Sequence, residues 1–348
     1  MDLPKLESLD VFGKRVLLRA DVDVGDKLEV DDDLKLCTFF PTINYLIENE
    51  TRIIIFGHRG RPDGVDKDLS LAPVAVRLSE LLGKEIKFVD QIVGEKVEKE
   101  VESLKEREML MLENVRFDFR EKENNDEFAS ELASLGDCYV NEAFSASDKE
   151  FTSISALPRK LPKAAGLHFM KEVENLESVL ENPKRPIVII MGGVKKDKLD
   201  YLDDFKKIAD KVLVAGRFPE FLPEDYKDEK VVVAQLNQDK EDITIHSIEM
   251  FEREIAKAGT IIFAGPMGKY EDDGQRLGTK KVLEAVVNSS AFKLAGGGDT
   301  QQALATFNCA DKFDWVSVGG GATLKFLAKG TLPGIEVLRL DNDFSSRN

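Results

Sequence analysis

The sequence predicts an α/β protein built from two doubly wound parallel-sheet domains that are joined by a helix. Short apolar stretches alternate with longer helical stretches along most of the 348 residues. Parallel strands are connected through helices that cover both faces of the sheet, so this alternation favours a parallel sheet between two helical layers. A chain of this length is long for one hydrophobic core, and two domains are therefore the default expectation.

The first half carries five predicted strands with helices between them. The strands are expected at residues 15–24, 52–58, 86–90, 109–113 and 137–144. The helices, in which apolar side chains recur at helical spacing, are expected at residues 37–48, 71–82, 93–104 and 126–135.

The second half repeats this scheme after a break in the chain. Residues 170–180 predict a charged amphipathic helix, and the stretch 181–186, which contains two prolines, ends it and marks the domain boundary. Strands are expected at residues 186–193, 211–216, 230–235, 259–266, 291–298 and 314–321, with helices at 245–258 and 278–288. The predicted domains are 1–168 and 186–331, with 169–185 between them.

Composition excludes several functional classes. The formal net charge of −16 disfavours broad contact with nucleic acids or anionic membranes, because the overall field repels polyanions. Cys37, Cys138 and Cys309 are odd in number and widely spaced, which indicates neither a disulfide framework nor a zinc site. No apolar run is long enough to cross a bilayer, and the first residues lack a signal pattern, so we expect a cytoplasmic protein.

Chemistry-bearing residues gather where the predicted strands end, which is where open parallel sheets bind ligands. In the first half these residues are arginines, carboxylates and a histidine: Asp21, Asp23, His58, Arg59, Arg61, Glu113 and Arg116. In the second half they are glycines: 192–193, 265–268, 296–298 and 319–321. Arginine forks suit a phosphate or carboxylate on a small substrate, whereas bare backbone suits a nucleotide.

The run Gly296–Thr300 is the strongest single motif. Its glycines let the backbone approach an anion, and the helix that follows aims free N–H groups at a phosphate. Asp299 could hold magnesium, or Asp299 and Thr300 could cap the helix, so a tight turn with an Asp cap is the alternative. The chain contains no Walker-type phosphate loop, no G-x-G-x-x-G after its first strand and no protein-kinase signature.

Six ordered motifs resemble those of the phosphoglycerate kinase family. They are Gly57–Pro62, Leu112–Phe117, Tyr139–Phe144, Gly265–Gly268, Gly296–Thr300 and Gly319–Ala322. The resemblance runs from about residue 14 to Leu338. It implies a first domain that binds 3-phosphoglycerate and a shortened second domain that binds Mg²⁺ with ADP or ATP. It also implies that domain closure precedes transfer and that residues 332–348 return to the first domain.

The resemblance implies a role for each matching residue. Asp21, Asp23, His58, Arg61, Arg116 and Lys149 would bind the triose substrate. Lys35, Lys195 and Lys198 would act in catalysis. The nucleotide would contact Lys198, Glu271, Gly297, Gly298, Asp299, Thr300 and Gly320, with Asp299 on the magnesium. The expected partners are the small substrates of a monomer, without nucleic acid or membrane.

Several positions depart from the family pattern. Lys35 stands where the family has an arginine and loses its two-point fork, and the loop Asp148–Phe151 replaces the family's His-Arg-x-His. Asp23 replaces an asparagine, and residues 218–241 replace a connection longer by several dozen residues. These changes predict a slower reaction and a shallower or rebuilt purine site. They leave open an alternative, a relative that binds nucleotide or triose phosphate without efficient turnover.

Overall fold

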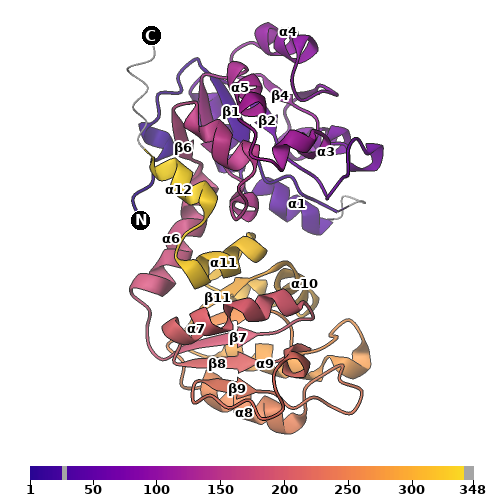
Figure 1. The fold of residues 1–348 in the computed structure, drawn as a ribbon, viewed down its shortest axis with the longest axis vertical. Coiled ribbons are helices and arrows are strands. Elements are labelled where there is room, and N and C mark those ends of the chain that lie inside the picture. The colour runs from indigo at the N-terminus through magenta and orange to yellow at the C-terminus, as the bar shows by residue number, and fades with distance from the viewer. Residues whose placement is uncertain (26–29, 341–348) are drawn as a thin grey trace. The chain divides into compact units, whose positions relative to one another are not determined.

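The structure, a computed structural model, describes residues 1–25 and 30–340 and divides into two compact units (Figure 1). Unit 1 holds Met1–Val173 and the chain from Leu332 onward, and unit 2 holds Glu174–Thr331. Each unit contains a six-stranded sheet in which every pair of neighbouring strands is parallel. The predicted fold class is therefore confirmed.

The sheet of unit 1 has the order β3-β4-β2-β1-β5-β6. Its strands are β1 (Arg15–Arg19), β2 (Arg52–Phe56), β3 (Ile86–Phe88), β4 (Met109–Met111), β5 (Cys138–Asn141) and β6 (Lys163–Ala165). Val16 of the central strand β1 pairs with Ile53 on one side and Cys138 on the other. All five strands expected here are present, whereas β6 was not predicted, because a Lys-Ala-Ala segment has low strand propensity.

The α-helices of unit 1 begin with one difference from prediction. The helix expected at 37–48 begins three residues later, with Pro41 in its first turn, where the missing N–H costs nothing, and a separate helix at 30–37, which was not predicted, precedes it. The helices are α1 (Val30–Cys37), α2 (Phe40–Glu48), α3 (Ala72–Leu82), α4 (Glu95–Ser103), α5 (Asp126–Ser134) and α12 (Pro333–Arg339). The short helices are η1 (Leu6–Ser8), η2 (Lys67–Leu69), η3 (Val115–Phe117), η4 (Phe119–Glu121), η5 (Phe144–Ala146), η6 (Thr152–Ala156) and η7 (Leu157–Arg159).

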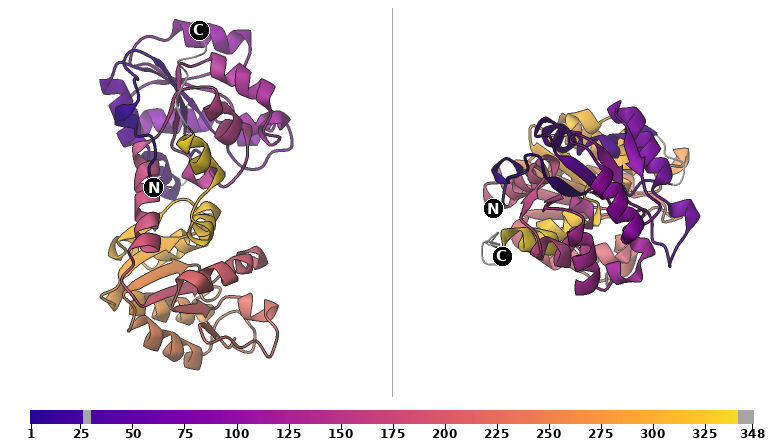
Figure 2. Two further views of the ribbon diagram at one scale, coloured as in Figure 1. Left: turned by 60° about the vertical axis from the view of Figure 1, so that its left-hand side comes forward. Right: turned by 90° about the horizontal axis from the view of Figure 1, so that it is seen from above.

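Helix α12 packs within unit 1 although it follows all of unit 2 in the sequence. It contacts β6, η6 and η7, and Figure 2 shows it in yellow beside elements of unit 1. The amide N–H of Gly334 donates to the carbonyl oxygen of Ser147 at 2.9 Å. The expected return of 332–348 extends past this helix, but residues 341–348 lie outside the described part of the chain.

The sheet of unit 2 has the order β12-β11-β10-β7-β8-β9. Its strands are β7 (Ile187–Met191), β8 (Lys211–Val214), β9 (Val231–Val233), β10 (Thr260–Ala264), β11 (Phe292–Gly296) and β12 (Trp315–Ser317), one within each predicted segment. The helices are α6 (Leu167–Glu181), within which the division between the units falls, α7 (Leu202–Ile208), α8 (Ile245–Ile255), α9 (Leu277–Asn288), α10 (Gly298–Thr306) and α11 (Gly321–Lys329). The short helices are η8 (Lys196–Tyr201), η9 (Phe218–Phe221), η10 (Asp273–Gln275) and η11 (Ala310–Lys312).

Both faces of the unit 2 sheet are buried. Val188 and Ile261 belong to one apolar cluster with Phe251 of α8 and with side chains of α9. The residues that alternate with them along the strands, such as Ile189 and Ile262, are equally buried on the opposite face. A sheet covered on both sides can place polar groups only at its ends, so ligand chemistry is confined to the loops. Among the described residues, no helix combines the length and apolarity that a bilayer span requires.

Candidate functional site

A buried carboxylate follows the central strand of unit 1. Asp21 is 2% exposed, and its Oδ1 lies 3.0 Å from Nζ of Lys35 on α1. The same ammonium donates to the carbonyl oxygen of Asp23 at 2.7 Å. Apart from this ion pair with Lys35, neither carboxylate oxygen of Asp21 accepts a hydrogen bond from the described residues. A buried acceptor with open lone pairs is costly unless a ligand supplies donors, so Asp21 is well suited to bind a hydroxyl.

Asp23 is held by the loop that follows the neighbouring strand β2. The N–H of Gly60 donates to its Oδ1 at 2.8 Å, and His58 Nε2 lies 3.4 Å from its Oδ2. Burial raises the pKa of Asp23, but the hydrogen bonds and the nearby Lys35 outweigh it, so the pKa lies well below its usual range. Burial lowers the pKa of His58 to about 4, so the imidazole is neutral at pH 7.

Arg19, which sequence reasoning did not select, supports His58 from the core. It is 1% exposed; its Nη2 lies 3.0 Å from His58 Nδ1, and its Nε donates to Ser153 Oγ at 2.9 Å. Ser153 in turn donates to the buried carboxylate of Glu121. The available signal was an arginine that ends an apolar strand, because such a charge is rarely buried without function or partners.

Arg116 lies beside this group, in the short helix η3 that follows β4. Its Nη1 donates to the carbonyl oxygen of Gly60 at 2.6 Å, and its guanidinium carbon lies 5.4 Å from the ring centre of Phe151. Its Nε is buried and donates to no described residue. Burial lowers the pKa of Arg116, and the neighbouring charge of Arg19 adds to that effect. An anion placed here would relieve both the burial and the repulsion.

Two further predicted residues lie at the margin of this cluster. Arg61 is exposed, yet its charge reaches Arg116 and contributes to the lowering of the Arg116 pKa. Lys149 lies on the loop that carries Phe151, but its ammonium is half exposed and pairs with Asp148 at 2.6 Å. The structure thus brings Asp21, Asp23, Lys35 and His58 together through direct contacts. Arg116 joins them through Gly60, which also contacts Asp23, while Arg61 lies nearby and Lys149 pairs with Asp148.

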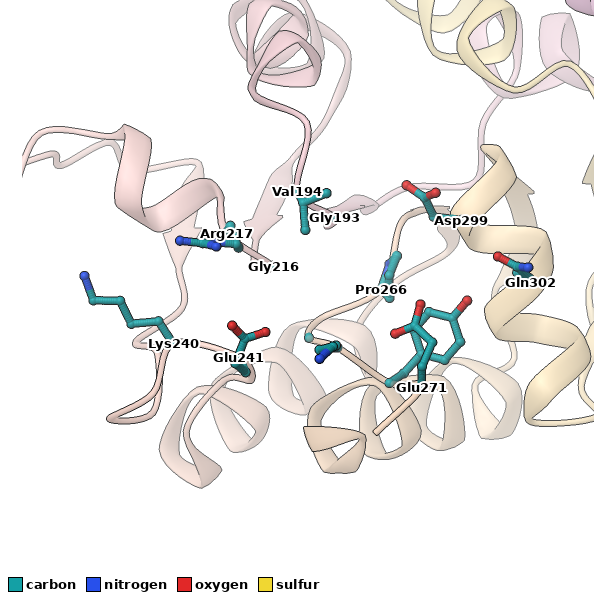
Figure 3. Close-up of a pocket in the computed structure, with 13 residues that line it drawn as sticks. Gly193, Val194, Gly216, Arg217, Lys240, Glu241, Pro266, Glu271, Asp299 and Gln302 are labelled. Carbon is teal, nitrogen blue, oxygen red and sulfur yellow. The ribbon is translucent and has the colours of Figure 1, made fainter. Parts of the chain in front are cut away.

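Unit 2 carries a pocket of about 380 Å³ beyond the carboxyl ends of its strands (Figure 3). Its floor is formed by loops that three glycines, Gly192, Gly216 and Gly265, bring into contact, and of these Gly216 lines the pocket. A Cβ on Gly192 would lie 2.0 Å from the carbonyl oxygen of Pro266, and one on Gly265 would lie 2.2 Å from that of Gly192. A Cβ on Gly216 would lie 2.4 Å from backbone atoms of Gly193. Only glycine permits this approach, which leaves a surface of peptide groups for a flat or anionic ligand.

Asp299 stands at one end of this pocket, in the first turn of α10. The helix begins at Gly298, after Gly297, whose φ of 111° is a conformation that favours glycine. Asp299 Oδ2 lies 3.4 Å from Lys198 Nζ. Thr300 is buried, and its hydroxyl donates to the carbonyl oxygen of Gly296 at 2.8 Å, which fixes the turn. A helix N-terminus with an adjacent ammonium favours phosphate.

Asp299 also fits magnesium. A Cβ on Gly193 would lie 3.7 Å from Asp299 Oδ2 and 3.2 Å from Lys198 Nζ, so its absence leaves space between these groups. Within the described residues no group of three or more metal-ligating side chains occurs. One carboxylate is enough for Mg²⁺ when phosphate oxygens and waters complete the coordination.

The remaining predicted residues of unit 2 lie at different depths. Glu271 is exposed and lines the pocket with Asp299. Lys195 is exposed and directly precedes η8, on which Lys198 lies. Gly320 precedes α11 with a φ of 55°, much as Gly297 precedes α10, so the start of α11 also exposes backbone N–H groups. Gly320 does not line the pocket.

The opposite side of the pocket was not foreseen. It is formed by Arg217, Lys240 and Glu241, which lie at the two ends of the connection from β8 to α8. Sequence alone identified this connection as shortened, but gave no sign that its ends close around the pocket.

Comparison with known proteins places these features in context. The sequence model of the family described as "Phosphoglycerate kinase" matches residues 6–222 and 219–330. The phosphoglycerate kinase of Dictyoglomus turgidum is 37% identical over 386 residues, covering 96% of this chain and 98% of that protein. The phosphoglycerate kinase of Thermomicrobium roseum is 36% identical over 385 residues, with 96% and 98% covered.

Solved structures agree. The phosphoglycerate kinase of Pyrococcus horikoshii superposes with a TM-score of 0.83 at 25% identity, covering 97% of this chain and 98% of that one. The phosphoglycerate kinase of Coxiella burnetii gives a TM-score of 0.81 at 28% identity, with 97% and 99% covered. The 386-position alignment exceeds the 348 residues of the chain by 38, so at least that many positions have no counterpart here. The two family matches meet at 219–222, in the shortened connection.

Proposed function

Because the chain belongs to the phosphoglycerate kinase family, we propose that it moves a phosphoryl group reversibly between 1,3-bisphosphoglycerate with ADP and 3-phosphoglycerate with ATP. Homology over 96% of the chain makes it a carboxyl-acceptor phosphotransferase of glycolysis. That full-length match is the observation that carries the proposal, and the two strand-end sites supply groups of suitable chemistry for each substrate.

Unit 1 binds the triose. The buried carboxylate of Asp21 accepts a hydrogen bond from the glycerate hydroxyl, since its oxygens have open lone pairs. The guanidinium groups of Arg61 and Arg116 donate to the anionic ends of the ligand, and neutral His58 shares its single N–H, at Nε2, between Asp23 and the ligand. Asp23 positions His58 through the contact with Nε2, and Lys149 contributes least because Asp148 holds its charge.

Unit 2 binds the nucleotide along the glycine floor of its pocket. Its phosphates meet the N–H groups at the start of α10, around Gly297, Gly298 and Thr300, with Gly320 offering a second helix start. Lys198 neutralises phosphate charge, and Glu271 accepts from the ribose. Mg²⁺ bound by Asp299 would neutralise further charge on the phosphate oxygens.

The protein contributes little covalent chemistry to this reaction. A terminal phosphate oxygen of ADP attacks the acyl phosphorus, the bond from phosphorus to the carboxyl oxygen breaks, and the carboxylate leaves with its electron pair. The negative charge on the oxygens of the transferring phosphoryl group is the main contribution to the activation barrier, and positioned cations lower that barrier. We assign this role to Lys35, Lys195 and Lys198.

A coupled assay with 3-phosphoglycerate, Mg²⁺ and ATP tests the function. We expect turnover that depends on all three, and a rate equal to the blank in a folded sample would contradict it. One observation favours the slower alternative: the ammonium groups of Lys35 and Lys149 are both paired with acidic residues.

We place the reaction in the cytoplasm, in keeping with three free cysteines, and propose a monomer, which sedimentation would test.

A further inference from the structure

One side of the unit 2 pocket is lined by the cations Arg217 and Lys240 and by the carboxylate of Glu241. The two cations are paired with a neighbouring carboxylate, that of Glu220. Arg217 Nε donates to Glu220 Oε2 at 2.6 Å, and Lys240 Nζ donates to Glu220 Oε1 at 3.1 Å. Figure 3 shows Arg217 and Lys240 extending to the left, away from Pro266. Both cations line the pocket, but they pair with Glu220 and not with Glu241.

Glu241 presents a carboxylate from a fixed backbone. Its N–H donates to Asn237 Oδ1 at 3.1 Å, and its carbonyl oxygen accepts from the N–H of Lys269 at 2.8 Å. Its carboxylate makes no hydrogen bond or ion pair with the described residues, although its charge raises the pKa of Arg217 and of Lys269 from a distance. In Figure 3 the carboxylate points upward, toward Gly216 and Gly193. It is an acceptor aimed into the pocket.

Glu241 and Asp299 lie on opposite sides of the pocket (Figure 3). The proposed function puts the phosphates and magnesium at Asp299, and this inference rests on that placement. A nucleotide that lies across the glycine floor then brings its base to the side where Glu241 stands. The base-facing side therefore offers a two-oxygen acceptor.

We propose that Glu241 reads the Watson–Crick edge of the base and makes the site prefer guanine nucleotides to adenine nucleotides. Guanine presents two parallel donors, N1–H and the 2-amino group, and a carboxylate accepts both, as it accepts the fork of an arginine. Adenine presents one donor, its 6-amino group, beside the N1 lone pair, which faces a carboxylate oxygen with like charge. A site built to accept two N–H groups rejects a ligand that leaves an acceptor unpaired.

The test is calorimetric titration of the full chain with GDP, IDP and ADP in the presence of Mg²⁺. We expect GDP to bind at least tenfold more tightly than ADP. IDP keeps N1–H but lacks the 2-amino group, and we expect its affinity to fall between the two.

Glu241→Gln supplies the matched variant. Its amide both accepts and donates, which suits the adenine edge, so we expect the ratio of ADP to GDP dissociation constants to fall at least tenfold. Glu224→Gln, an exposed residue of the same connection that does not line the pocket, should leave the ratio unchanged.

The outcomes separate the two claims. ADP binding as tightly as GDP, or a ratio that Glu241→Gln does not change, would overturn the guanine preference while leaving the nucleotide site in place. Failure of all three nucleotides to bind folded protein would overturn the nucleotide site itself and this inference with it. The comparison of GDP with ADP needs no variant, so a misfolded substitution cannot decide it.

Discussion

Arg19 Nη2 lies 3.0 Å from His58 Nδ1, deep in unit 1. A guanidinium can only donate, so Nδ1 accepts and the imidazole proton lies on Nε2, which is directed at Asp23 Oδ2. The contact therefore fixes the tautomer of His58 and makes it a neutral donor at pH 7. Arg19 is therefore a positioning residue for His58.

This burial of neutral His58 predicts a loss of stability in weak acid. Its pKa in the folded protein, about 4, lies below the ordinary value of 6.5, so the unfolded chain binds the proton more readily. The stabilisation is complete above pH 6.5 and is lost as the pH falls toward 4. From pH 7.5 to pH 5 this residue accounts for about 2 kcal/mol of unfolding free energy. Urea denaturation measures this: between pH 7.5 and pH 5 the unfolding free energy of His58→Asn should fall by correspondingly less than that of the native protein. An equal fall in the two proteins would contradict the prediction.

Replacement of Lys35 by arginine should speed the reaction. Its ammonium now makes single contacts, with Asp21 Oδ1 at 3.0 Å and with the carbonyl oxygen of Asp23 at 2.7 Å. Arginine would keep the charge and add a second donor for the transferring phosphoryl group. We expect a severalfold rise in kcat for Lys35→Arg and a fall for Lys35→Met in the coupled assay. An unchanged kcat for both variants would show that position 35 does not face the transferring group.

Removal of the Asp299 carboxylate should abolish the effect of magnesium on nucleotide affinity. Asp299 is only loosely tied to Lys198, at 3.4 Å, so its oxygens are available to a cation. We expect Asp299→Ala to weaken GDP and ADP binding at least tenfold in Mg²⁺ and to have little effect in EDTA. Asp311→Ala, an exposed carboxylate paired with Lys312, is the control. Equal magnesium dependence in Asp299→Ala and the native chain would exclude this metal site.

A methyl group in the pocket floor should cost both stability and binding. Gly216 has a φ of 60°, and its Cβ would meet backbone atoms of Gly193 at 2.4 Å. Left-handed strain of this kind costs about 1–3 kcal/mol before the clash is counted. Gly216→Ala should lower Tm by several degrees, whereas Gly274→Ala, with open space around its Cβ, should not. Equal Tm values would mean that the floor is not rigid.

The two cations of unit 1 should differ in their effect on 3-phosphoglycerate. Arg116 is buried with an unused Nε, whereas Lys149 is half exposed and paired with Asp148. Exposed ion pairs contribute little, so Lys149→Ala should change KM less than threefold. Arg116→Lys, which loses the planar fork, should raise KM more than tenfold. Steady-state kinetics measures KM for 3-phosphoglycerate in both variants. A larger rise in KM for Lys149→Ala than for Arg116→Lys would show that Lys149 contacts the ligand despite its ion pair with Asp148.

Much of the fold was predictable because buried parallel strands are short apolar runs in this chain. Each expected strand is present and ends two to five residues before the predicted limit, since the polar and glycine residues that follow each run belong to the loops. Strand β6 escaped because Lys163 and two alanines do not form such a run. Helix α7 escaped because its seven residues are too few to show a periodic pattern.

Residue pattern alone pointed to positions two or three residues past a strand end. Asp21, His58 and Asp299 are such positions, and the topology of a parallel sheet brings them to one end, whereas Lys35 on α1 came only from the family resemblance. Arg19 lies inside a strand, and its contacts with His58 and Ser153 depend on how distant segments pack. Glu241 lies in a loop between β9 and α8, and only tertiary structure shows that Arg217 and Lys240 pair with Glu220 and not with Glu241.

The contact of loops through Gly192, Gly216 and Gly265 divides the unit 2 pocket into an invariant part and an adjustable part. A floor made of peptide groups cannot be altered by a single substitution, because any side chain at one loop would displace its neighbour. The side of the pocket formed by Arg217, Lys240 and Glu241 can change its side chains without such a clash. On the proposed placement of the nucleotide, changes in one surface connection can therefore alter base preference without disturbing the groups proposed to bind the phosphates.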